Sequence, residues 1–165
     1  MRVTLTLLLI ALFNLGFGQE KFDVTAVEKF QKDLNSEYAD AKTSPLTADD
    51  LAKFKSLDFY PINEKAFVVA QFIRTENEKP FVMPTTAAKK PMYVKYGEAH
   101  FKLDGKELKL NIYRNIELSK KEEYKDHLFL PFSDLTSGKE SYIGGKYIDL
   151  KIPAGNTIVI DFNQS

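Results

Sequence analysis

The chain has 165 residues, with 23 basic and 23 acidic side chains, two histidines and no cysteine. A balanced charge without a basic cluster gives no electrostatic reason to bind nucleic acid. The absence of cysteine excludes disulfides and thiol chemistry within this sequence, and with only two histidines it argues against a zinc site. We therefore expect no metal, no cofactor and no nucleic-acid partner.

The first residues have the order of a secretory signal. Arg2 gives a positive start, residues 3–13 are almost wholly apolar, and Gly16 and Gly18 place small residues at the cleavage positions. A membrane-spanning helix needs roughly 20 apolar residues, and this run is shorter. We expect residues 1–18 to be removed on export to the periplasm or the medium, leaving no membrane span.

Two helices are predicted at the start of the remaining single domain, residues 19–165. Thr25 and Glu28 have the spacing of a capping box. Behind them an apolar stripe recurs at intervals of three or four residues, at Val27, Phe30, Leu34, Tyr38 and Ala41. A second helix is predicted from its N-cap Thr47 until Pro61, with an inward face of Leu51, Phe54 and Leu57.

From residue 66 onward the sequence has the period of strands. Runs rich in β-branched and aromatic residues predict strands at residues 66–73, 128–132, 146–151 and 157–162, and residues 81–83 are a short apolar stretch between two prolines. Residues 85–90 are predicted to be a loop, and the charged residues 116–127 a surface loop or helical turn. The fold class predicted is α+β and mainly β. Two N-terminal helices precede a mostly antiparallel curved sheet or half-open barrel.

The strongest local prediction is a hairpin with Asp104 and Gly105 at its tip. A two-residue Asp-Gly loop favours a turn in which both residues have positive φ. This register pairs Phe101 with Leu108 and Ala99 with Leu110 on the core face. It pairs His100 with Lys109 and Lys102 with Glu107 on the opposite face.

One long segment resembles a known protein family. It carries Pro131, Phe132, Asp134, Thr136, Gly138, Glu140, Tyr142, Gly144, Gly145, Tyr147, Asp149 and Leu150, followed by Ile-Asp-Phe-Asn at residues 160–163. This pattern resembles the bacterial family called domain of unknown function 1684, and residues 79–85 and 93–97 are also similar to it. Lys146 stands where the family usually has arginine, which retains the charge but loses the planar fork.

The family pattern continues past residue 163 into YNPxCAY and CPxPPxxN segments, whereas this chain ends at Ser165. The resemblance therefore implies either a chain shortened at its C-terminal end or a protein that has lost this part of the pattern. It implies no established activity.

Residues 134–149 are the candidate site, because acids, hydroxyls, glycines and tyrosines gather there beside a predicted strand. The candidate ligand-binding residues are Asp134, Thr136, Gly138, Glu140, Tyr142, Gly144, Gly145, Tyr147 and Asp149. Of these, Asp134, Glu140, Tyr142 and Tyr147 are predicted to face one cavity. The alternative is a structural segment whose polar side chains bond to neighbouring backbone.

No motif in the sequence names a reaction. His100 and His127 have the character of surface residues, and no serine stands in a G-x-S-x-G sequence. The sequence favours an exported module, not an enzyme, that binds a small molecule or a component of the cell envelope. The alternatives are a hydrolase that uses carboxylates near Glu140 and Asp149, and a domain that assembles with another protein.

The export signal predicts that the mature protein begins at Gln19 and is recovered outside the cytoplasm. N-terminal sequencing of the exported protein checks this directly. Recovery of a chain that still begins at Met1 contradicts the prediction.

Overall fold

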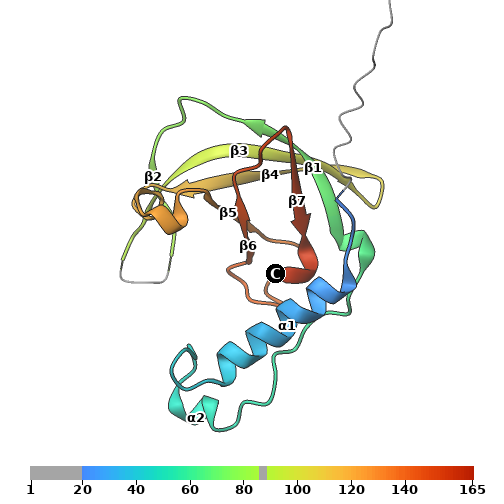
Figure 1. Cartoon of the computed structure of the whole chain (residues 1–165), viewed down its shortest axis with the longest axis vertical. Helices are drawn as coiled ribbons and strands as arrows, with labels where there is room; N and C mark the ends of the chain where they lie inside the picture. Colours follow the sequence, from blue (N-terminus) through green and yellow to red (C-terminus); the bar gives the residue numbers. More distant parts are fainter. Residues whose placement is uncertain (1–19, 86–88) are drawn as a thin grey trace, which may run out of the picture.

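The structure is a computed structural model that describes residues 20–85 and 89–165. The predicted export signal at residues 1–18, and part of the predicted loop at 85–90, lie outside the described residues. The described part of the chain forms two N-terminal helices and one antiparallel sheet that curls into a half-barrel (Figure 1). The predicted mainly β, α+β fold class is confirmed.

The first helix, α1 (Val24–Ala39), starts earlier than the capping box predicted. Its N-cap is Asp23, whose carboxylate accepts a hydrogen bond of 2.9 Å from the backbone N–H of Thr25. The predicted Thr25 cap is therefore wrong. Aspartate caps at least as well as threonine, and its negative charge also favours the positive end of the helix dipole.

The second helix, α2 (Ala48–Leu51), begins at the predicted N-cap but is much shorter than predicted. Thr47 Oγ1 accepts a hydrogen bond of 3.3 Å from the N–H of Asp50. The chain then leaves the helix, and the N–H of Leu57 donates to Asn35 Oδ1 of α1 at 2.7 Å. A one-turn helix gains little from its own hydrogen bonds, so the following residues bond to α1 instead.

The described residues form a seven-stranded sheet in the order β6-β5-β4-β3-β1-β7, with β2 paired to β3 beside this path. The strands are β1 (Phe67–Arg74), β2 (Phe81–Val82), β3 (Met92–Leu103), β4 (Lys106–Asn115), β5 (His127–Phe132), β6 (Lys146–Lys151) and β7 (Thr157–Asp161). Short 3-10 helices occur at Glu64–Ala66, Leu118–Lys120, Glu122–Tyr124 and Phe162–Gln164. β1 pairs with β3 on one side and with β7 on the other, all antiparallel.

The hydrophobic core fills the concave face of the curled sheet. Alternate residues of each strand point inward, as the period of a strand requires. The buried cluster consists of Val68, Ala70, Ala99, Ile112, Leu128, Leu130, Ile148, Ile158 and Ile160. Ala70 of β1 and Ala99 of β3 are fully buried. Their small side chains occupy little volume on the concave face of the sheet.

The predicted hairpin and its register are confirmed. Asp104 and Gly105 have φ angles of +48° and +75°, and β3 pairs with β4 as the Asp-Gly turn requires. Lys102 and Glu107 form the predicted ion pair at 3.1 Å. The prediction that Leu108 packs in the core is wrong. Its side chain is 41% exposed, because it lies beyond the buried cluster near the open end of the half-barrel.

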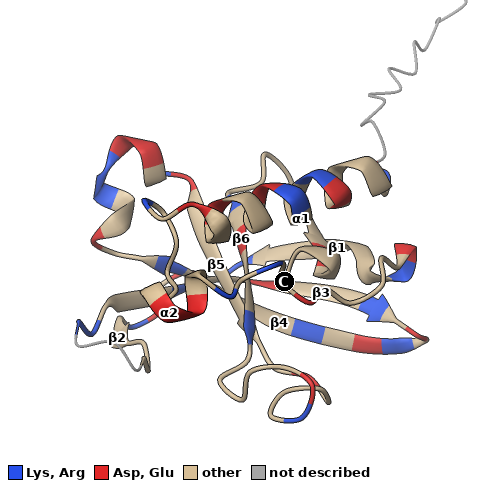
Figure 2. Ribbon diagram, turned by 90° about the horizontal axis from the view of Figure 1, so that it is seen from below, with Lys and Arg blue, Asp and Glu red and all other residues tan. Residues whose placement is uncertain are grey.

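The opposite face of the hairpin carries a cluster of charges around Glu98. Its carboxylate accepts hydrogen bonds from Lys95 at 2.5 Å, from Lys109 at 3.0 Å and from His100 at 2.9 Å when that ring nitrogen is protonated. These bonds, with that from Lys95 the largest, lower the pKa of Glu98 to about 2. Figure 2 shows lysines and acidic residues interspersed along β4 and α1.

Replacing Gly105 with valine is expected to lower the free energy of unfolding by about 1 kcal/mol or more, because a β-branched residue resists positive φ. The matched control is Gly155→Val. A Cβ added at either glycine meets no atom within 4 Å, but Gly155 lies outside the left-handed region. Denaturant unfolding of both variants checks the prediction, and equal midpoints contradict it.

Candidate functional site

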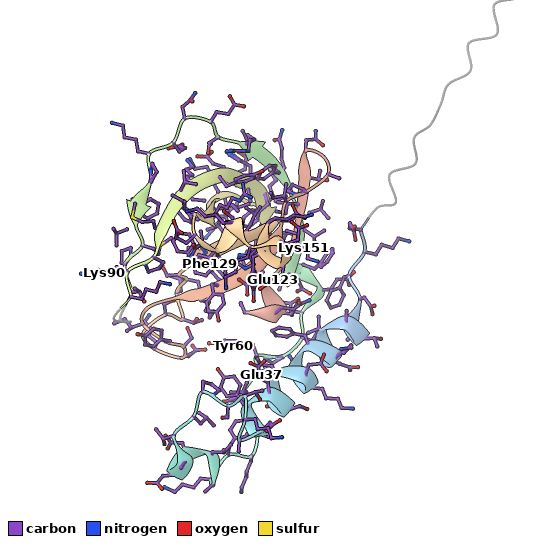
Figure 3. The ribbon with its side chains drawn as sticks, turned by 60° about the vertical axis from the view of Figure 1, so that its left-hand side comes forward. Glu37, Tyr60, Lys90, Glu123, Phe129 and Lys151 are labelled. Carbon is purple, nitrogen blue, oxygen red and sulfur yellow. The ribbon has the colours of Figure 1, made fainter. Side chains whose placement is uncertain are left out.

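A cavity of about 990 Å³ opens at one end of the half-barrel. Its walls come from the β3–β4 hairpin, the loop between β5 and β6, the segment between α2 and β1, and the last turn of the chain. Figure 3 shows Tyr60, which belongs to the segment between α2 and β1, between α1 and the sheet. The cavity therefore exists only when parts of the chain that are distant in sequence have come together.

One wall of the cavity is apolar. Inward-facing side chains of β3, β4 and β5 and the last turn form it: Phe101, Leu103, Leu108, Leu110, Phe132 and Phe162. The ring centroid of Phe162 lies 5.1 Å from that of Phe132 and 5.8 Å from that of Phe101. Because Leu108 is only partly covered, this wall presents apolar surface that a ligand could bury.

A polar corner borders this wall at Phe132 and is formed by Asp134, Thr136, Ser141 and Lys146. Lys146 Nζ donates to Asp134 Oδ2 at 2.7 Å and to Thr136 Oγ1 at 2.9 Å. Asp134 Oδ1 accepts from the N–H of Thr136 at 2.9 Å and from its hydroxyl at 2.5 Å. Thr136 Oγ1 also lies 3.0 Å from Ser141 Oγ. The corner is a connected hydrogen-bond network.

Lys146 is the centre of this corner. Its side chain is only 14% exposed, and its Nζ lies 5.4 Å from the ring centroid of Tyr60 and 5.9 Å from that of Phe132. Both distances fit an ammonium group held over aromatic faces. An ammonium has three N–H donors. Two of them are used, and the third has no acceptor among the residues that the structure describes.

Asp134 is held in its charged form. Burial raises the pKa of Asp134, but the hydrogen bonds from Lys146 and Thr136 and the charge of Lys146 together lower it to about 2. Since the carboxyl pKa is depressed, its contribution to stability is present above the ordinary value of 3.8 and is lost as the pH falls toward 2. At neutral pH Asp134 and Lys146 therefore form an ion pair in which each charge compensates the other.

The structure brings part of the predicted site segment to the cavity. Asp134, Thr136 and Glu140 line it. Gly138 and Gly145 have φ angles of +79° and +90° and shape the two turns of the loop between β5 and β6. At Gly145 a Cβ would lie 2.5 Å from the carbonyl oxygen of residue 132, so the close approach of two backbones there requires glycine.

The remaining apolar and aromatic side chains of this loop point to solvent. Tyr142 is 66% exposed and lies against Gly144, whose missing side chain makes room for the ring. Leu135 and Ile143 are still more exposed. The loop thus turns polar side chains toward the cavity and apolar side chains away from it.

The structure places Tyr147 and Asp149 on the other face of β6, because side chains alternate along a strand. The ring of Tyr147 lies 5.4 Å from that of Phe129, and burial, followed by the nearby charge of Asp149, raises the pKa of Tyr147. Asp149 Oδ1 lies 2.9 Å from His127 Nε2. Tyr142, Tyr147 and Asp149 are absent from the described lining of the cavity, so the predicted convergence of Asp134, Glu140, Tyr142 and Tyr147 is not what the structure shows.

Sequence reasoning missed the central residue of the polar corner. Lys146 drew attention only as a departure from the family pattern. The alternation of β6 contains the signal that would have found it, because Lys146 shares a face with Ile148 and Leu150, both of which belong to the core side. No local pattern in the sequence indicates that Tyr60 and the hairpin leucines line a cavity, because only the folded chain brings them together.

Within residues 20–85 and 89–165, no three side chains of His, Cys, Asp or Glu gather where they could hold a metal ion. No helix in the same ranges is long and apolar enough to cross a membrane.

Replacing Lys146 with methionine is expected to raise the pKa of Asp134 from about 2 toward 3.8, because the variant removes both a hydrogen bond and a positive charge. An NMR titration of the side-chain carboxyl resonances measures this pKa. Lys139→Met is the matched control, since Lys139 is an exposed lysine of the same loop. An unchanged pKa of Asp134 in the Lys146 variant contradicts the assignment.

Comparisons with known proteins agree with this architecture. The chain is similar in structure to an uncharacterized protein of Haloarcula marismortui solved by NMR in solution, with a TM-score of 0.62 and 25% sequence identity. The alignment covers 84% of this chain and 75% of the other. No curated protein matches the sequence. Residues 52–165 match the family described as protein of unknown function (DUF1684), and the chain belongs to that family.

Proposed function

We propose that this protein is an exported binding module whose end cavity takes a small amphipathic molecule. The observation that carries the proposal is the cavity itself, which has an apolar wall facing a compact polar corner. Ligand pockets in proteins typically have volumes of about 300–1,000 Å³, mostly apolar linings and a few placed polar groups. The cavity lies at the upper end of this volume range and has an extended apolar wall, and polar residues such as Asp58, Asn63 and Lys65 line the rest of it.

Export is part of the same proposal and is supported by the sequence. Arg2, the apolar run at residues 3–13 and the glycines at 16 and 18 follow the order of a cleaved signal. The ligand is then met outside the cytoplasm, either as a free small molecule or as a component of the cell envelope.

Binding fits the cavity better than hydrolysis does. Glu140 lines the cavity, but Asp149 lies on the other face of β6 beside His127. The hydrolase alternative needs two carboxylates on one bound substrate. Glu140 and Asp149 do not share a cavity, and Asp134, which lines the cavity together with Glu140, is ion-paired with Lys146. No histidine occurs in the described lining to activate a serine there.

Binding of the fluorescent apolar probe N-phenyl-1-naphthylamine tests the proposal. The wild-type chain is expected to enhance its fluorescence, and Leu108→Glu to weaken probe binding by about tenfold or more, because a carboxylate in the apolar wall is costly to bury beside the probe. Leu108 is 41% exposed in the free protein, so the variant is expected to fold.

The matched control is Val82→Glu, because Val82 is 48% exposed and does not line the cavity. Near-UV circular dichroism verifies that both variants are folded. The proposal fails if the wild-type chain does not bind the probe, or if the two variants bind it equally well.

A further inference from the structure

We infer that the cavity selects amphiphiles with an uncharged head group that both accepts and donates a hydrogen bond, such as a hydroxyl, over those with an anionic head. This inference rests on the proposed function and names the ligand class for the same cavity. The chemistry that discriminates is the closed Lys146–Asp134 ion pair.

The head group is placed by the contact between the polar corner and the apolar wall. Phe132 belongs to both, because its ring lies 5.9 Å from Lys146 Nζ and 5.1 Å from the ring of Phe162. A ligand whose body lies on Phe162 and Leu108 therefore has its head beside Lys146. The rings of Tyr60 and Phe132 also hold the ammonium in place.

The charges of the corner are already compensated within the protein. Lys146 Nζ and Asp134 Oδ2 are 2.7 Å apart, so an anionic head that approaches the lysine also approaches a carboxylate. Glu140 adds a second negative charge to the same wall. The anion therefore loses water at the corner without gaining a free counter-charge.

An uncharged polar head meets no such opposition. The third N–H of Lys146, which has no acceptor among the described residues, can donate to its oxygen. A carboxylate offers about four lone-pair sites. Asp134 uses three, for the N–H and hydroxyl of Thr136 and for Lys146, so one remains for a donor of the ligand. A hydroxyl supplies both partners with a single group.

Three competitors that share one twelve-carbon chain test the inference: 1-dodecanol, laurate and dodecylamine. Each displaces N-phenyl-1-naphthylamine from the full chain at pH 7, below its own aggregation concentration. Dodecanol is expected to compete at least about fivefold better than laurate, which corresponds to one uncompensated ion in a partly solvated site.

Two variants each remove one charge of the ion pair. Asp134→Asn leaves Lys146 uncompensated and is expected to improve laurate relative to dodecanol by about fivefold. Lys146→Met leaves Asp134 uncompensated and improves dodecylamine by a similar factor. Lys139 lies in the loop between β5 and β6, as Asp134 does, but outside the described lining of the cavity. Lys139→Met is therefore expected to leave the order of the three compounds unchanged.

The outcomes separate the two proposals. If the wild-type chain does not bind the probe, the proposed function fails. If the probe binds but laurate competes as well as dodecanol, or no compound competes, the inference on the head group is overturned while the cavity remains a binding site. If one variant does not fold, the other still decides. A folded variant whose preference does not shift toward its charged ligand also overturns the inference.

Discussion

The pairing of β1 with both β3 and β7 is the constraint on which the rest of this structure depends. It brings Phe67 opposite Asp161, and so returns the last strand of the chain to the first. The sheet that results is curled, and one face of its strands forms the inside of a half-barrel. The inside at one end is not filled by the core, and the segment between α2 and β1, together with the last turn of the chain, walls it instead.

The same curl explains why the polar corner is close to apolar surface. β5 and β6 pair antiparallel, so Phe132 at the end of one strand lies opposite Lys146 at the start of the next. The loop between them returns over the open end with Asp134 and Thr136 on its inner side. A largely covered ammonium needs nearby compensation, and the loop supplies it. The polar corner thus both fixes the loop to β6 and forms the polar part of the cavity.

Local signals predicted most of the fold, whereas Asp134, Thr136 and Glu140 alone among the nine candidate site residues are in the described lining of the cavity. The hairpin was predictable because the Asp104-Gly105 turn and the alternation of its strands both depend on near neighbours. The start of α1 was not, because Asp23 and Thr25 are both capable caps and the competition between them is decided by the folded helix. In the site, the composition of residues 134–149 identified the loop correctly. Tyr147 and Asp149 do not line the cavity, because the alternation of β6 places them on its other face. The apolar wall of the cavity arises from tertiary packing, which local sequence patterns do not predict.

The long sequence separation between β1 and β7 has a consequence for the order of folding. The β3–β4 hairpin closes a two-residue loop and can form within about 1–10 μs, whereas joining β1 to β7 requires the closure of most of the chain. Until β7 arrives, β1 is an open sheet edge that carries Val68, Val69 and Ala70, and such edges recruit other chains. The last turn of the chain, which follows β7, completes the cavity only at that final step. Any ligand that binds the finished cavity would therefore oppose reopening of this edge, and a higher ligand concentration would lower the fraction of molecules in which the edge is open.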